Sequence, residues 1–128
     1  MIKIRPRETV IMADDFHGLV EWYRDVLGFK VTQLFTNGSH YANMATSTGI
    51  EIGIALVTEI GIEPGNRTNN TVVLQIEVDD LPAFFEYIKE TKGGVAFGPS
   101  FNEKDEFWFG SIADPEGNQI WVVDSNCP

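Results

Sequence analysis

The residues best suited to chemistry are carboxylates and an amide that fall on predicted strands. Glu8, Glu51 and Glu77 carry the carboxylates, and Gln75 carries the amide. Because successive side chains point to opposite faces of a strand, Gln75 and Glu77 lie opposite the apolar Val72, Leu74, Ile76 and Val78, which are expected beneath the helix, and Glu51 likewise lies on the face away from the helix. Glu8 is expected to be a general base or the counterion of a cationic ligand, and Gln75 to bond the ligand or a protein group. The competing interpretation of Glu8 is a solvated residue beside a neighbouring arginine.

A second set of candidate residues is aromatic. Trp121 shares a strand face with Val123, opposite the aliphatic Ile120 and Val122. An indole in a cleft offers a flat surface for planar or cationic ligands, worth about 1 kcal/mol per contact, although a buried Trp more often fills a core. Trp108 is expected either to wall the cleft or to pack in a dimer interface, and the sequence does not choose between the two.

Other reactive groups lack the neighbours that their chemistry requires. His17 and His40 are the two histidines of the chain, and neither belongs to a pair such as H-x-H, so both are predicted to lie at the surface. The single Cys127 has no internal partner. No Ser-His-Asp order, glycine-rich phosphate loop or C-x-x-C pair occurs, which leaves nucleophilic and nucleotide chemistry without support.

Composition limits the environment and the partners. The 128 residues carry a formal charge of −10, which repels nucleic acid and anionic lipid and modestly favours cationic partners. No apolar run approaches the roughly 18 residues that a membrane span requires. The N-terminus lacks the apolar core of a signal peptide, and a single cysteine fits a reducing compartment. We therefore expect a soluble, cytoplasmic protein with no nucleic-acid or membrane partner.

Hydrophobic periodicity and turn residues define the first half of the chain. A helix is predicted over 16–27, beginning after the possible cap Asp15 and ending at Gly28. The expected strands cover residues 2–12, 29–36, 40–45 and 50–57. Asn37-Gly38 predicts a tight turn between the second and third of these strands.

The second half of the chain repeats this order after a connector over 59–70, which is rich in turn residues. A helix is predicted from Leu81, after a possible cap at Asp80. The expected strands cover residues 71–78, 95–97, 107–113 and 119–123. A shift of 65 positions superposes the acidic caps, the apolar stripe and the terminal glycine of the two helices, which indicates an internal duplication.

The duplication predicts an α+β fold of two tandem βαβββ modules with mainly antiparallel sheets. Module one covers residues 1–58 and module two residues 71–128, and together they are expected to form one domain over 1–128. The segments WYRDVLGFKV and ADPEGNQIWVV, placed around this repeat, resemble the glyoxalase, bleomycin-resistance and extradiol-dioxygenase superfamily, also called the vicinal oxygen chelate family. The resemblance implies that the two modules curl their sheets around a cleft, and it suggests a homodimer.

The resemblance also implies where metal-dependent members carry their ligands. It places Glu8 at the first ligand position, Val73 at the second and Trp121 at the position of the terminal Glu; the duplication maps Trp121 onto Gly53. Val73 and Trp121 have no lone pairs for a cation, so we expect no bound metal or other cofactor. Gln75, Glu77 and Glu51 could in principle make a displaced metal site.

These observations lead to one preferred function and two rivals. We expect a metal-independent protein that binds a small, planar or cationic molecule. The expected ligand contacts are Trp121, Gln75, Val73, Gly53, Glu51, Glu77 and Trp108. The first rival is a lyase, isomerase or dioxygenase with a relocated metal or with Glu8 as general base. The second is a dimerising module whose cleft is vestigial.

Overall fold

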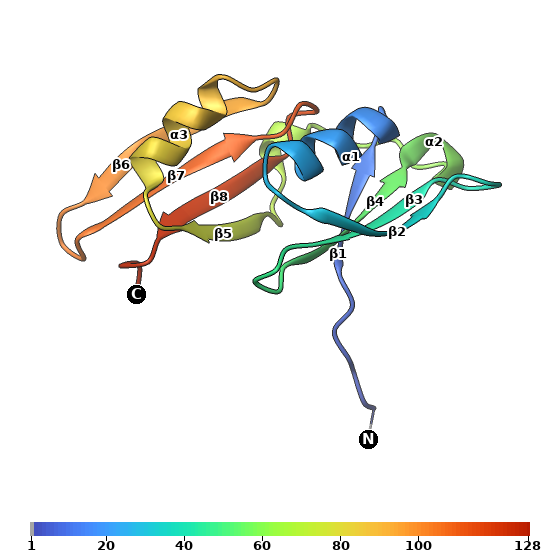
Figure 1. Cartoon of the computed structure of the whole chain (residues 1–128), viewed down its shortest axis with the longest axis horizontal. Coiled ribbons are helices and arrows are strands. Elements are labelled where there is room, and N and C mark those ends of the chain that lie inside the picture. Colours follow the sequence, from blue (N-terminus) through green and yellow to red (C-terminus); the bar gives the residue numbers. More distant parts are fainter. Residues whose placement is uncertain (1) are drawn as a thin grey trace. The chain divides into compact units, whose positions relative to one another are not determined.

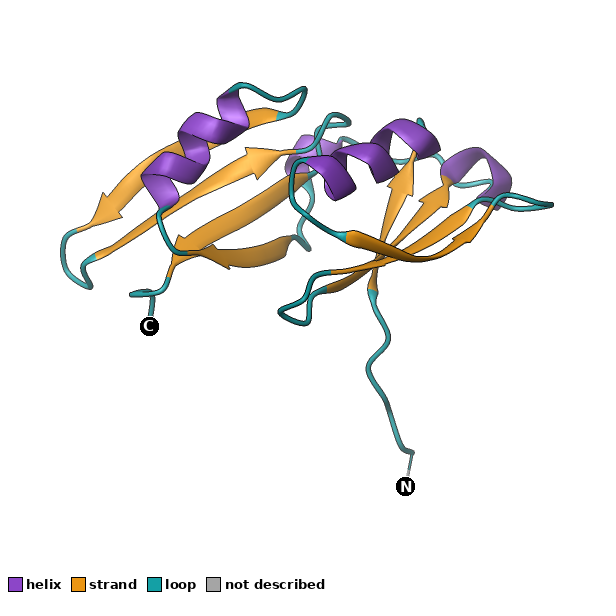
Figure 2. Ribbon diagram, in the orientation of Figure 1, coloured by secondary structure: helices purple, strands orange, loops and turns teal. Residues whose placement is uncertain are grey.

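The computed structural model describes residues 2–128, which divide into two compact units. Unit 1 is Met1–Pro64 and unit 2 is Gly65–Pro128. The boundary falls inside the expected connector. Each unit has its own sheet and its own helices on one face of that sheet, and each is described by itself (Figures 1 and 2).

Unit 1 follows the order β, α, β, β, β. Its elements are β1 (Thr9–Ala13), α1 (Phe16–Asp25), β2 (Lys30–Phe35), β3 (Tyr41–Ala45), β4 (Glu51–Leu56) and the short α2 (Val57–Ile60). The strand order is β1-β4-β3-β2. The β1–β4 pair is parallel, whereas the β4–β3 and β3–β2 pairs are antiparallel. The sheet is therefore mixed and mainly antiparallel.

Unit 2 repeats the same order and the same pairings. Its elements are the short 3-10 helix η1 (Arg67–Asn69), β5 (Leu74–Val78), α3 (Leu81–Lys89), β6 (Gly94–Asn102), β7 (Phe107–Ala113) and β8 (Gln119–Asp124). The strand order is β5-β8-β7-β6, with β5–β8 parallel and the other two pairs antiparallel. The tandem βαβββ arrangement predicted from the duplication is confirmed.

The predicted caps start both long helices. Asp15 Oδ1 accepts a hydrogen bond of 3.0 Å from the Gly18 backbone N–H, and Asp80 Oδ1 accepts one of 3.1 Å from Ala83. Each aspartate satisfies a backbone donor that has no partner inside the helix. Three residues past the end of α1, Gly28 has φ of 76°, a conformation that glycine adopts at little cost.

Each sheet packs one face against its helices and leaves the other without helices; we call the latter the helix-free face. In unit 1, α1 buries Leu19 and Tyr23 on the side where Ile52 and Ile54 of β4 are also fully buried. In unit 2, α3 contacts β6, β7 and β8. The fully buried core residues of unit 2 include Leu81, Phe85 and Ile88 of α3, and Ile112 and Val122 of the strands beneath it. Burial of these apolar side chains, at about 25 cal/mol per Å², holds each unit together.

Two predicted strands begin later than expected, and the reason is the same in both units. β1 starts at Thr9, which pairs with Ile52, so residues 2–8 lie before the strand. β5 starts at Leu74, which pairs with Ile120, so Val73 precedes the strand. A strand exists only where a neighbouring strand supplies hydrogen bonds. Val72, expected beneath the helix, is 84% exposed instead.

Three further predictions were wrong in detail. The pairing of Phe35 with Tyr41 leaves a loop over 36–40, longer than the tight turn expected at Asn37-Gly38. The predicted connector contains η1 and the second half of α2. β6 has nine residues rather than three, because its register with β7 shifts twice and pairing resumes beyond each irregularity.

Candidate functional site

The two helix-free faces carry equivalent rows of side chains at their centres. In unit 1 the cross-strand partners form the row Val10, Gly53, Asn43 and Gln33. In unit 2 the corresponding row is Gln75, Trp121, Ser111 and Phe97. The register therefore places Trp121 at the position that Gly53 occupies in unit 1, as the duplication predicted.

Glu8 is the centre of a hydrogen-bonded group in unit 1. The Tyr41 hydroxyl donates to Glu8 Oε1 at 2.5 Å, and Asn43 Nδ2 lies 2.9 Å from Oε1 and 3.1 Å from Oε2. Gly53 makes room for this group, because a Cβ there would overlap the Tyr41 hydroxyl and lie 2.7 Å from Glu8 Oε1. The role of Gly53 in unit 1 is therefore to leave room for the hydrogen bonds between Glu8 and Tyr41.

Glu8 and Asn43 of this group line a polar pocket of about 470 Å³ in unit 1. The polar pocket is lined by Pro6, Arg7, Glu8, Thr32, Gln33, Asn43, Met44, Ala45 and Glu51. A carboxylate offers about four lone-pair sites, of which Tyr41 and Asn43 use three on Glu8. The remaining site on Oε2, together with Glu51, is suited to a cation or to a hydrogen-bond donor.

Tyr41 itself is held in the protonated form. Its partial burial, its hydrogen bond to Glu8 and the negative charge of that carboxylate raise the pKa of Tyr41 to about 12, and the positive charge of Arg7 opposes the shift in part. A buried hydroxyl beside an anion disfavours phenolate because ionisation would place a second negative charge in the same site. Tyr41 is therefore a hydrogen-bond donor at neutral pH.

A second, largely aromatic pocket of about 350 Å³ lies on the helix-free face of unit 2. The aromatic pocket is lined by Gln75, Phe97, Phe109, Gly110, Ser111, Gln119, Trp121, Val122 and Val123. Trp121 is 53% exposed and Phe97 is 55% exposed, whereas Ile120 and Val122 on either side of Trp121 are buried. The Phe97 and Phe109 rings lie 5.9 Å apart. Alternation along β8 thus presents the indole on the helix-free face, as its spacing predicted.

The turn before β8 fixes where that strand begins, and so fixes the position of Trp121 within it. Asp114 is buried, and its Oδ1 accepts hydrogen bonds from the backbone N–H groups of Glu116 at 2.9 Å and Asn118 at 3.1 Å. Gly117 has φ of 90°, which the turn requires and which other residues rarely adopt. The D-P-E-G-N segment therefore acts as a rigid connection that sets the register of Trp121 against β7.

A few polar groups accompany the aromatic rings of unit 2. Gln75 is exposed and pairs directly with Trp121 across β5 and β8. Ser111 is buried, and its hydroxyl donates to Gln119 Oε1 at 3.1 Å. Glu77 follows Gln75 on the same face of β5 and is exposed beside Val123, its pairing partner. A ligand over the indole would meet an amide and a nearby carboxylate.

Trp108 does not share this face. Its neighbour Phe109 lines the aromatic pocket, so alternation along β7 directs Trp108 to the helix side of the sheet. There its ring lies 5.2 Å from the ring of Phe101, and its backbone N–H donates to Asp124 Oδ2 at 3.1 Å. Trp108 therefore does not line the aromatic pocket beside Trp121, which was one of its two expected positions.

The sequence interpretation missed Tyr41, Asn43, Phe97 and Phe109. Tyr41 and Asn43 lie on β3, which was expected but was given no site residues. Strand alternation would have found them, because Asn43 pairs with Gly53 and Tyr41 lies two residues before it, on the same face of β3. Phe109 follows Trp108 directly, and only Trp108 was considered there. Phe97 ended a predicted strand that proved to be much longer.

The donors present do not fit the metal site of metal-dependent relatives. At the implied ligand positions only Glu8 is a donor, and Tyr41 and Asn43 already bond to both of its oxygens. Among residues 2–128, no three His, Cys, Asp or Glu side chains are grouped as a three-ligand metal site would require. The same described residues contain no helix that is long and apolar enough to cross a membrane.

The fold and the two helix-free faces define a tandem βαβββ protein of the glyoxalase type. A family model described as Glyoxalase/Bleomycin resistance protein/Dioxygenase superfamily matches residues 5–122. The chain therefore belongs to this superfamily, which hosts many different chemistries on one fold.

Solved structures agree with this fold. UcmS2 superposes with a TM-score of 0.79 at 16% identity, covering 97% of this chain and 100% of that chain. A hypothetical protein from S. aureus gives a TM-score of 0.76 at 15% identity, covering 95% of each chain. A member of the same superfamily from Sphaerobacter thermophilus gives 0.71 at 16% identity, covering 94% and 98%. No curated protein matches the chain.

Proposed function

We propose that the protein binds a small, planar molecule in the aromatic pocket of unit 2 and that it needs no metal to do so. The observation that carries the proposal is the half-exposed indole of Trp121 beside Phe97 and Phe109, on a sheet face with no helix over it. Pockets lined by apolar and aromatic side chains with a few polar groups are typical of small-molecule sites.

The physical gain comes from covering these rings. Trp121 and Phe97 each keep more than half of their surface exposed, and a flat ligand would remove part of that surface from water. Stacking adds about 1 kcal/mol for each well-placed ring contact. Gln75 supplies an amide for orientation, and Glu77, together with the formal charge of −10, favours a ligand with a positive group.

The polar pocket of unit 1 supports binding more readily than catalysis. An enzyme that used Glu8 as its base would need the carboxylate to take a proton from a substrate. Tyr41 and Asn43 already donate to that carboxylate, and this arrangement suits the fixing of a cationic or donor group. We therefore assign Glu8 and Glu51 to ligand binding. The homodimer and the cytoplasmic location remain predictions.

A ligand screen tests the proposal directly. The midpoint of thermal unfolding is measured with planar aromatic cations, planar neutral molecules and non-planar amines, for the unmodified protein and for Trp121→Ala. Planar cations are expected to raise the midpoint most, and Trp121→Ala is expected to lose that rise. Trp108→Ala is the matched control, since it removes an indole from the other side of the same sheet. Equal rises in the unmodified protein and Trp121→Ala would contradict the proposal.

A further inference from the structure

We propose that His17 and His40 together bind a divalent transition-metal ion such as Zn²⁺ on the helix-covered side of unit 1. They are the two histidines of the chain, and folding brings them together from α1 and from the residue before β3. The proposed site is separate from the polar pocket. Tyr41 turns toward Glu8 on the helix-free face, whereas the preceding His40 lies by Phe16 of α1.

The separation of the two imidazoles fits a shared ion. Their ring centroids lie 5.9 Å apart, with an angle of 86° between the ring planes. Two imidazole nitrogens bound at about 2 Å to one tetrahedral ion place their ring centroids about 5 to 6 Å apart. The two rings are therefore close enough to share an ion once their nitrogens turn toward one another. The pair supplies two protein donors, and water would complete the coordination.

Glu59 of α2 prepares His40 for this role. Its Oε1 lies 2.5 Å from His40 Nδ1, and its Oε2 accepts the His40 backbone N–H at 2.7 Å. With the proton held on Nδ1, the lone pair of His40 is on Nε2, the nitrogen left for a metal. Carboxylates orient histidine ligands in this way in many metal sites.

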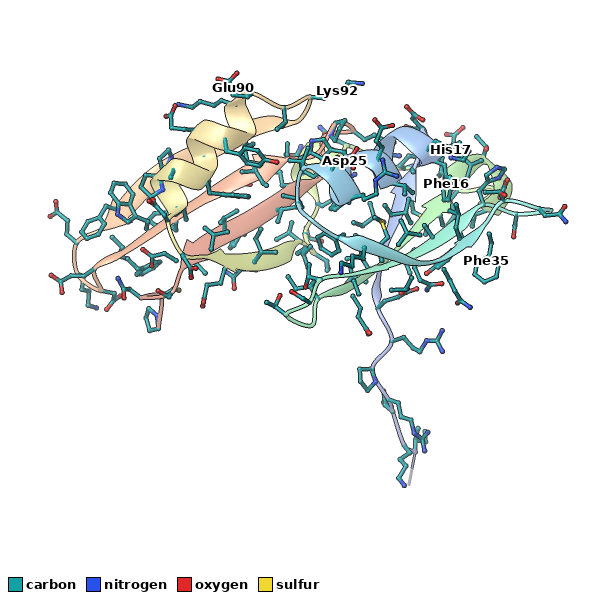
Figure 3. The ribbon with its side chains drawn as sticks, in the orientation of Figure 1. Phe16, His17, Asp25, Phe35, Glu90 and Lys92 are labelled. Atoms are coloured by element: carbon teal, nitrogen blue, oxygen red, sulfur yellow. The ribbon has the colours of Figure 1, made fainter. Side chains whose placement is uncertain are left out.

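The surroundings restrain the rings and leave the site accessible. The Phe16 ring centroid lies 5.2 Å from that of His17 and 5.3 Å from that of His40, so the phenyl ring packs against both imidazoles. Figure 3 labels Phe16 and His17, which come from the same end of α1. The His40 and Glu59 side chains are each 30% exposed, and His17 is exposed. Imidazole prefers Zn²⁺, Ni²⁺ and Cu²⁺ over Mg²⁺ or Ca²⁺. The formal charge of −10 also favours a cation.

Calorimetric titration of the untagged full chain with Zn²⁺ tests the proposal. One ion is expected per chain, with an affinity that His17→Gln lowers at least tenfold and that the double variant His17→Gln/His40→Gln abolishes. Glu59→Gln is expected to lower the affinity about tenfold, the range typical of lost orienting partners. Because His17 is exposed, its substitution should not affect folding.

Two control variants separate this site from others. Cys127→Ser and Glu8→Gln are expected to leave Zn²⁺ affinity unchanged, because neither residue belongs to the proposed site. Electron paramagnetic resonance of the Cu²⁺-loaded protein should show coupling to imidazole nitrogens. Unchanged affinity in His17→Gln, loss of binding in Glu8→Gln, or a Cu²⁺ spectrum with oxygen ligands alone would each overturn the proposal.

Discussion

The helix-free faces of the two units share a backbone pattern and differ in chemistry. At equivalent positions, unit 1 has Gly53 and Asn43 where unit 2 has Trp121 and Ser111. The glycine makes room for the hydrogen bonds of Glu8, and the tryptophan contributes an exposed ring. The two units therefore share one strand register. The side chains in the central row of each helix-free face decide whether its pocket is polar or aromatic.

The same comparison extends to the cores beneath the helices. Phe85 and Gly110 of unit 2 occupy the positions of Val20 and Ala42 in unit 1. A Cβ on Gly110 would lie 2.6 Å from the Phe85 ring, so the larger helix residue is accommodated by the smaller strand residue. Close packing requires such compensation in volume.

The largest expected effect follows from breaking this compensation. Gly110→Ala should lower the free energy of unfolding by about 1 to 3 kcal/mol, because the fully buried Phe85 cannot move aside. Adding Phe85→Val should recover part of the loss that Gly110→Ala causes, by recreating the unit 1 combination. Denaturant unfolding of the two single variants and the double variant measures the coupling. Strict additivity would show that the two positions do not share space.

A smaller loss of stability is expected when a single hydroxyl of unit 1 is removed so that the residue matches its equivalent in unit 2. Tyr41→Phe places in unit 1 the residue found at the equivalent Phe109, and it removes one donor to Glu8. We expect a loss of about 1.5 kcal/mol in unfolding free energy, the low end of the range for a hydrogen bond to a charged group, because the pair is only partly buried. Phe109→Tyr is the reciprocal control, and a loss in both variants of the same size would indicate that the hydroxyl has no specific role.

The titration of Tyr41 sharpens this comparison without a mutation in the core. Because the folded-state pKa of Tyr41 is about 12, above its ordinary value of 10.0, its contribution to stability is present below pH 10 and is lost as the pH rises toward 12. The difference in phenolate absorbance between the unmodified protein and Tyr41→Phe isolates the titration of Tyr41 from those of Tyr23 and Tyr87, and it should appear late. Glu8→Gln should lower this pKa only in part, because burial is the largest cause. Titration of Tyr41 at its ordinary value would refute the buried hydrogen bond.

The smallest expected effect concerns stability at the aromatic pocket. Trp121→Ala should change the unfolding free energy by less than about 0.5 kcal/mol, because the indole is 53% exposed and the ring is not part of the core. Trp22→Ala, at a buried position of α1, should cost several times more. Thermal unfolding of both variants makes the comparison. Equal losses would mean that Trp121 is a core residue.

Local rules were enough to predict much of the fold. The caps Asp15 and Asp80 and the βαβββ repeat depend on neighbours in the sequence. The position of Trp121 on the helix-free face depends on strand alternation. The mapping of Trp121 onto Gly53 needed only the repeat. These features were predictable because each depends on a period of two or 3.6 residues, or on a single capping residue.

The Glu8 group was not predictable to the same degree, because it depends on register between strands. Asn43 of β3 pairs with Gly53 of β4, and Gly53 pairs with Val10 of β1, so two separate pairings bring β3 close to Glu8. A shift of one residue in either pairing would turn a different set of side chains toward Glu8. The partners of Glu8 also lie more than 30 residues away, at separations of 33 and 35.

The most direct test of the account follows the three indole N–H signals by nuclear magnetic resonance during titration with a planar aromatic cation. Trp22 is a buried residue of α1, Trp108 lies on the helix side of β7 and Trp121 lies in the aromatic pocket, so each signal reports a different location. The account predicts that the Trp121 signal moves and saturates while the other two stay in place. Movement of Trp108 or Trp22 with a stationary Trp121 would contradict it.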